Sequence, residues 1–138
     1  MKKIFSILSF LLLLLGASFV VESEEILNPG KVYKRYERSI VQKVISEKKG
    51  ILFVHVRGQD KGRSSSREYA NQKLKALEKL SGYISKLAGL ELSEKIRYKL
   101  SGLQVVSRHI EDGEVSLTLA VPMSEVRNQV ERLSQSVK

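Results

Sequence analysis

The 138-residue chain contains no cysteine. It therefore has no disulfide bond, no structural zinc site with thiolate ligands and no thiol nucleophile. The absence of cysteine also excludes a lipoprotein whose lipid is attached to a cysteine just after the signal sequence. We expect the folded part of the chain to be held together by its hydrophobic core alone.

Histidine and aspartate are scarce, which limits the chemistry that the chain can support. His55 and His109 are the only histidines, and Asp60 and Asp112 are the only aspartates. Two imidazoles without a carboxylate or thiolate partner make a poor metal site. Both aspartates fall in expected turns and not beside a nucleophile and a base. We therefore expect no enzymatic activity, no metal and no cofactor.

The first 23 residues are typical of a secretory signal peptide. A basic start is followed by an almost wholly apolar run over residues 4–15 and by small residues at 16–18. We expect cleavage between about residues 17 and 24, and an exported protein that is periplasmic or associated with the cell envelope. The alternative is a retained N-terminal membrane anchor, because the apolar stretch over residues 4–21 approaches the roughly 20 residues that cross a bilayer.

The chain after residue 23 has the size of one domain and is strongly basic. Removal of Lys2, Lys3 and Glu22 leaves 22 basic and 14 acidic residues, a net charge of +8. This charge favours polyanionic partners, which for an exported protein means anionic lipid or cell-wall polymer. We do not expect nucleic acid, because Phe53 is the only phenylalanine beyond the signal segment and no strand carries an aromatic pair for base stacking.

Residues 24–30 are expected to form a linker, and residues 31–138 a single α+β domain. Asn28 and Pro29 suit the N-cap and the first position of a helix. The apolar residues that follow recur at spacings of three and four, which predicts an amphipathic helix that ends before Gly50. Their β-branched members leave an alternative, in which residues 39–46 form a strand followed by a four-residue hairpin loop. The apolar residues are Tyr33, Tyr36, Ile40, Val41, Val44 and Ile45.

Three strands are predicted. Residues 51–57 form an apolar and β-branched run that ends at Gly58. Residues 103–110 and 114–121 are expected to pair as a hairpin, because the Asp-Gly turn between them supplies the positive φ that tight hairpins require. In the last strand, one face carries Val115, Leu117, Leu119 and Val121, and the other face carries Glu114, Ser116 and Thr118.

Both histidines fall in these strands. His55 shares its face with Ile51 and Phe53, which predicts a partly buried histidine with a hydrogen-bond partner. His109 would face His55 if the two strands pair.

A long helix is expected to begin among the serines at 64–66 and to end at Gly89, with Glu68 in its first turn. One or two further helical turns are expected over residues 93–100, and Ser124 is expected to cap a last helix. The predicted buried positions are Tyr69, Ala70, Leu74, Leu77, Leu80, Ile84, Leu87 and Ala88 in the long helix, and Val126, Val130 and Leu133 in the last.

These elements predict an α+β fold with a small antiparallel or mixed three-stranded sheet packed against a long helix. The core order is β-α-β-β, with flanking helices. No internal repeat is visible in the sequence.

The strand-loop-helix segment resembles a small family of envelope proteins. Its features are Gly58 at the strand end, the Gly62 loop, and small residues along the helix, with a later Gly-x-x-Val start at Gly102. The family comprises the Lpp-twenty-type lipoproteins and the amino-terminal domain of flagellar assembly protein T, and the resemblance covers residues 51–121. It implies a periplasmic or outer-membrane-associated part that binds other envelope proteins. The lipid tether of the lipoproteins does not carry over, because this chain lacks the cysteine. Residues 103–133 are also loosely similar to the phospholipid-associated BON domain, whose final strand is missing here.

The loop before the long helix has the position of a phosphate-binding P-loop but not its sequence. Three residues separate its glycines where the motif needs four, and Arg63 stands in place of the lysine. A weaker anion site remains, because N–H groups at a helix N-terminus attract anions and basic residues lie around it. Glu68 opposes such a site. The candidate anion-binding residues are Lys61, Arg63, Ser64, Ser65 and Arg67.

Taken together, the sequence predicts an exported, non-enzymatic protein of the cell envelope that acts as a protein-interaction or assembly module. The alternative is a peripheral binder of anionic lipid or wall polymer through a basic surface. The partner proteins and the oligomeric state do not follow from the sequence.

Overall fold

The structure is a computed structural model that describes residues 28–89 and 100–136. The expected signal segment and nearly all of the helical turns expected over residues 93–100 lie outside the described residues. The described elements are α2 (Pro29–Ile40), β1 (Ile45–Lys48), β2 (Ile51–Gln59), α3 (Ser65–Leu87), β3 (Gln104–Glu111), β4 (Glu114–Pro122) and α4 (Met123–Ser136). None of the described helices is long and apolar enough to cross a bilayer.

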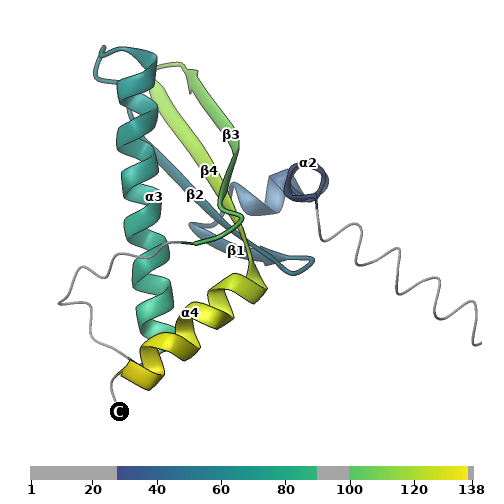
Figure 1. Ribbon diagram of the computed structural model, residues 1–138. Coiled ribbons are helices and arrows are strands. Elements are labelled where there is room, and N and C mark those ends of the chain that lie inside the picture. The colour runs from purple at the N-terminus through teal and green to yellow at the C-terminus, as the bar shows by residue number, and fades with distance from the viewer. Residues whose placement is uncertain (1–27, 90–99, 137–138) are drawn as a thin grey trace, which may run out of the picture.

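The α+β class is confirmed, with one more strand than expected. The described strands form one antiparallel sheet in the order β1-β2-β4-β3, so that β2 and β4 are central and β1 and β3 are edges. Figure 1 shows α3 on one side of this sheet and α2 on the other, with α4 at its lower end. The fold therefore has a sheet between two helical layers.

The larger core lies between the sheet and the helices α3 and α4. Alternate residues of β2 and β4 point to this side, as the two-residue period of a strand requires. The expected face of β4 is confirmed, because its four apolar residues are all buried. The buried core residues are Leu52, Val54 and Val56 of β2, Leu117, Leu119 and Val121 of β4, Ala76, Leu80 and Ile84 of α3, and Met123 and Val126 of α4.

The smaller core lies on the other side of the sheet, under α2. The Asn28 side chain accepts a hydrogen bond from the Lys31 backbone N–H, and Pro29 occupies the first turn, so the predicted helix start is confirmed. The ring of Tyr33 packs on that of Phe53 with centroids 6.2 Å apart. The buried members are Val32, Tyr33, Ile40, Ile51, Phe53 and Ala120.

The prediction for residues 31–49 is wrong in its second half. The helix ends at Ile40, and Ile45–Lys48 forms the edge strand β1, which pairs with β2. The alternative of a strand here is closer, but the turn has two residues, Lys49 and Gly50, both with positive φ. Pairing with the strongly apolar β2 outweighs the helical spacing in this short segment.

The buried stripe of α3 is rotated from the predicted one. Leu80 and Ile84 are buried as expected, but Leu74 is 62 % exposed and Leu87 is 51 % exposed. Buried positions recur every four residues from Glu68 to Ile84, and the buried polar side chains of the helix are Glu68, Gln72 and Ser85. Gln72 lies directly over Gly58, where an added Cβ would collide with its side-chain amide. Gly58 lies within strand β2, whereas the sequence predicts that it ends the strand.

The two hairpins repeat the same backbone, although the sequence does not repeat. Strands β2 and β4 have nine residues each, and both follow a two-residue turn with positive φ at both positions. The Asp60 N–H donates to the Gly113 carbonyl at 2.9 Å, and the Met123 N–H donates to the Gly50 carbonyl at 2.9 Å. The residue directly after each hairpin is therefore hydrogen-bonded to the turn of the other hairpin. Helix α4 begins at Met123, one residue before Ser124, so the prediction that Ser124 caps it is wrong.

Candidate functional site

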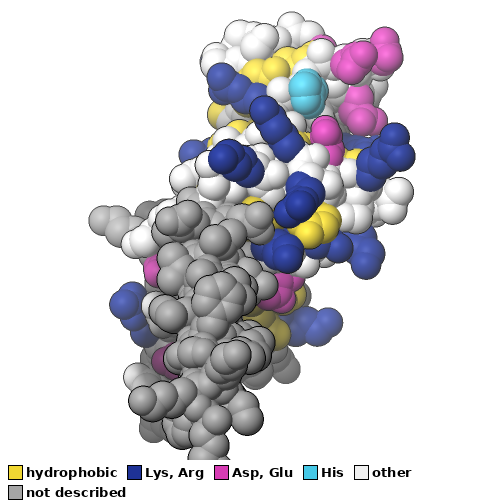
Figure 2. Space-filling view, turned by 90° about the vertical axis from the view of Figure 1, so that its right-hand side faces the viewer, with side chains coloured by type: hydrophobic (Ala, Val, Ile, Leu, Met, Phe, Trp, Pro, Cys, Tyr) yellow, Lys and Arg dark blue, Asp and Glu magenta, His cyan; other side chains and the backbone are white. Residues whose placement is uncertain are grey.

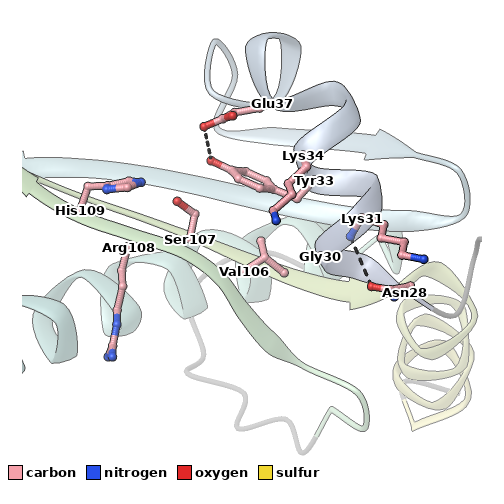
Figure 3. Close-up of a pocket in the computed structure, with 10 residues that line it drawn as sticks. All are labelled: Asn28, Gly30, Lys31, Tyr33, Lys34, Glu37, Val106, Ser107, Arg108 and His109. Carbon is pink, nitrogen blue, oxygen red and sulfur yellow. Dashed lines mark hydrogen bonds between the residues drawn. The ribbon is translucent and has the colours of Figure 1, made fainter.

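A groove of about 600 Å³ runs between α2 and β3 (Figure 3). One wall is formed by α2 and the other by β3, and the buried Tyr33 ring and the half-buried Val106 lie between them. The Tyr33 hydroxyl donates to the Glu37 carboxylate at 3.5 Å. The lining residues are Asn28, Gly30, Lys31, Tyr33, Lys34 and Glu37 of α2 and its cap, and Val106, Ser107, Arg108 and His109 of β3.

Part of the β3 wall of this groove is formed by the backbone of Arg108. The Arg108 side chain points away from α2 in Figure 3. Its guanidinium lies on the opposite side of the sheet, 5.0 Å from the centre of the Tyr69 ring on α3. Arg108 therefore borders the groove through its backbone.

The backbone groups of Arg108 face the free edge of the sheet. In a hairpin closed by a two-residue turn, the residue pair next to the turn is hydrogen-bonded and the pairs then alternate. The pairs Arg108–Leu117 and Ile110–Val115 are thus non-hydrogen-bonded, and their β3 members direct N–H and C=O away from β4. Among the described residues, no strand pairs with this side of β3. The groove consequently lies beside unpaired backbone donors and acceptors.

A second polar cluster lies at the centre of the sheet, on the same side as α2. His55 is buried more fully than predicted, and it has the expected hydrogen-bond partner, because its Nδ1 lies 2.7 Å from Thr118 Oγ1. Arg57 Nε donates to His55 Nε2 at 3.1 Å, so Nε2 is an acceptor and Nδ1 carries the proton that binds Thr118. Arg57 also donates to the Val41 carbonyl beyond α2 at 2.9 Å. Both ring nitrogens of His55 therefore have hydrogen-bond partners, and Arg57 joins the end of α2 to the sheet.

The pKa of His55 is lowered from its ordinary value of 6.5, first by burial, then by the positive charge of Arg57, against a smaller opposing effect of Glu114. A lowered pKa means that the unfolded chain takes up a proton at a higher pH than the folded chain. We expect the free energy of unfolding to fall as the pH drops below about 6.5, by at most about 1.4 kcal/mol per pH unit until His55 protonates in the folded state.

Denaturant titrations at several pH values measure this dependence. His55→Gln should flatten the slope below pH 6.5, whatever its effect on absolute stability. His109→Gln, at an exposed position, is the matched control and should keep the slope. An unchanged slope in the His55 variant would show that other groups govern the acid dependence.

The two histidines do not face each other. Strand β4 lies between β2 and β3, so the expected pairing of their strands does not occur. His55 is opposite Thr118, whereas His109 is opposite Ser116 and exposed. Within residues 28–89 and 100–136, no group of three or more histidine and carboxylate side chains is placed to hold a metal ion.

The candidate anion site at the start of α3 is occupied by the chain's own carboxylate. Glu68 is 1 % exposed and forms an ion pair with Arg63 Nε, and it accepts a further bond from the Lys61 backbone N–H at 3.3 Å. The Asn71 amide oxygen, turned toward Arg63, accepts from the same guanidinium at 2.8 Å. Ser64 is the N-cap, without a side-chain capping bond, and Ser65 and Arg67 are exposed. Glu68 thus takes two of the donors that an anion would need.

Sequence reasoning missed the groove. Its two walls are far apart in the chain, and none of its residues carries a motif. The sequence of β3 did offer a signal, because a strand that mixes polar and apolar side chains on both faces is typical of a sheet edge.

Comparisons with protein-family models, with curated proteins and with solved structures find no match for this chain, so the envelope-family resemblance stays a prediction and function rests on the site itself.

Proposed function

We propose that this chain is an exported, non-enzymatic protein of the cell envelope that binds a partner protein in the α2–β3 groove. An extended segment of the partner adds to the free edge of β3 and places alternate side chains in the groove. The observation that carries the proposal is the outward-facing backbone of Arg108 and Ile110 beside a groove with an aromatic floor. Recognition by strand addition uses this combination of main-chain bonds for affinity and side-chain pockets for specificity.

The edge is suited to one added strand. A register shift between Val105 and Ser107 interrupts the start of β3, which discourages long edge-to-edge association. The regular part of β3 runs from Ser107 to Glu111 and includes both outward-facing positions. A short segment is therefore the favoured occupant.

Two substitutions of Arg108 distinguish the contribution of its backbone N–H to binding from that of its side chain. Arg108→Pro removes the outward N–H, and proline is tolerated on an edge strand at such a position. Arg108→Ala keeps the N–H and loses only the contact with Tyr69. We expect Arg108→Pro to abolish retention of the partner from an envelope extract in high salt, and Arg108→Ala to retain it.

Hydrogen exchange supplies an independent readout of the same complex. The amides of Arg108 and Ile110 should exchange more slowly when the partner is bound, because they become hydrogen-bonded. Equal binding by both variants, or no added protection at these two amides, would place the interface elsewhere. Thermal unfolding of both variants checks that the sheet is intact.

Export is supported by the composition of residues 1–23 and is tested on the N-terminus. Mass spectrometry of the protein in a fractionated cell should find a first residue between Ser18 and Glu24 outside the cytoplasm. An intact Met1 on a cytoplasmic form would contradict export and return nucleic acid to the candidate partners.

A further inference from the structure

The α2–β3 groove is cationic along half of its length. Lys31 and Lys34 line it from the first half of α2, and Figure 3 shows them toward the end at Asn28 and Val106. Glu37 is the only carboxylate among the described residues that line the groove, and it lies toward the other end. Among the ion pairs between described residues, none involves Lys31 or Lys34. The two ends of the groove therefore differ in charge.

Glu37 does not form an ion pair with the lysines of the groove. It follows Lys34 by three positions, a spacing at which helical side chains can pair, but its carboxylate accepts from the Tyr33 hydroxyl. In Figure 3, the Lys34 side chain extends from α2 toward Val106, away from Glu37. The apolar floor formed by Tyr33 and Val106 thus lies beside a lysine ammonium. Such a place suits a side chain that ends in a carboxylate.

The surface around the groove has the same polarity. Figure 2, which views the side of the molecule that carries α2, shows Lys and Arg side chains spread over it and the acidic side chains gathered mainly near its upper end. Glu111, Asp112 and Glu114 are exposed around the β3–β4 turn, which Figure 1 places at that end. An anionic segment is therefore attracted to the Val106 half of the free edge and repelled near the turn.

The alternation of β3 determines which side chains of an added strand enter the groove. The Arg108 side chain points to the side of α3, so Ser107 and His109 point to the side of α2. Residues directly opposite each other in paired strands carry their side chains on the same face of the sheet. The residue that lies opposite Ser107 therefore directs its side chain into the groove, on the side of Lys34.

We propose that the partner segment that adds to β3 is acidic, and that an aspartate or glutamate opposite Ser107 forms an ion pair with Lys34, with Lys31 beside it. This inference rests on the proposed strand addition and names the chemistry of the bound segment. Main-chain bonds hold any extended segment, whereas charge pairs across the groove select among segments and steer their approach. The lysines therefore determine which partner binds.

Selection from a displayed library of random peptides tests the proposal, with the protein purified in the form in which the cell holds it. Peptides that bind the parent but not Arg108→Pro depend on the outward N–H and report on strand addition. We expect these peptides to be enriched in aspartate and glutamate at positions that share one face of an extended strand, because alternate side chains enter the groove.

Variants of the two lysines then test the ion pair. Lys31→Gln/Lys34→Gln should bind such a peptide roughly five- to tenfold more weakly, and the loss should shrink as salt screens the charges. Replacement of the peptide carboxylates by amides should weaken binding to the parent by a similar factor and binding to the double variant far less. Lys31→Arg/Lys34→Arg keeps the charge and should retain binding. The control Lys73→Gln/Lys79→Gln removes the same charge from exposed positions of α3 on the opposite side of the sheet, and should keep most of the affinity.

The possible results distinguish the acidic segment from strand addition itself. Peptides that depend on the Arg108 N–H but lack acidic enrichment, or that bind the lysine double variant equally well, would overturn the acidic segment and leave strand addition standing. An equal loss in the α3 control would indicate only net charge and would overturn the acidic segment as well. Peptides that bind Arg108→Pro as tightly as the parent, or the selection of no peptide, would overturn both proposals.

Discussion

Phe53→Ala is expected to lower the free energy of unfolding by about 3–5 kcal/mol, the range for loss of a fully buried phenylalanine. Phe53 is 0 % exposed and lies on central strand β2, between Ser46 of β1 and Ala120 of β4. Its ring supports Tyr33, the floor of the groove. The core under α2 is small, so the cavity left by the ring has few neighbours that can fill it.

This loss should be accompanied by local opening of α2. Hydrogen exchange of the α2 amides should accelerate more than that of α3, because α3 packs on the other core. Denaturant unfolding measures the global change. Leu74→Ala, at a position 62 % exposed, is the control and should change stability by no more than about 0.5 kcal/mol.

Since a loss of this size approaches the whole stability of a marginal domain, Phe53→Leu serves as the milder variant and should give a smaller loss of the same kind. A loss below about 1 kcal/mol for Phe53→Ala would mean that α2 is not anchored through this ring.

Arg63→Ala is expected to destabilise the protein by about 1–3 kcal/mol, because it leaves the buried Glu68 carboxylate without its charged partner. The figure lies below that for a fully buried pair, since Arg63 itself is 38 % exposed and water screens it. The sequence by itself favours a different result, in which Arg63 is a solvated residue whose loss affects only anion binding. Chemical denaturation of Arg63→Ala, which measures the free energy of unfolding, distinguishes these two results.

Two further variants test whether loss of the Arg63–Glu68 ion pair causes the destabilisation. Glu68→Gln/Arg63→Ala should be less destabilised than the sum of the single variants, because the pair acts as a unit. Arg67→Ala, at an exposed neighbouring position, should change stability by no more than about 0.5 kcal/mol. If Arg63→Ala is as stable as Arg67→Ala and sulfate still stabilises the parent but not the variant, the helix start is an anion site after all.

The α2 helix lines the groove on its β3 side, while its buried side holds the smaller core. The polar cluster at His55 ties the end of α2 to the sheet through Arg57. Acidification that protonates His55 would loosen this tie, so the position of α2 beside the groove depends on this anchor.

The sequence by itself determined the elements whose cause is local. The Asp112-Gly113 hairpin follows from a turn that needs positive φ at both positions, and the start of α2 follows from an N-cap side chain and a proline. The alternation of β4 specified its buried face, because one side of the strand is wholly apolar. The partnered, buried state of His55 followed from the residues with which it shares a strand face.

Tertiary structure decided what local sequence leaves open. The four residues of β1 become a strand only because β2 offers an apolar partner, and no short segment contains that information. The stripe of α3 turned toward Glu68 and Gln72 because Arg63 neutralises one and Gly58 makes room for the other. The groove exists because the sheet order places the edge strand β3 beside α2. Pairing between strands that are far apart in the sequence sets the positions of β1, the α3 stripe and the groove, and the spacing of residues in a short segment does not predict such pairing.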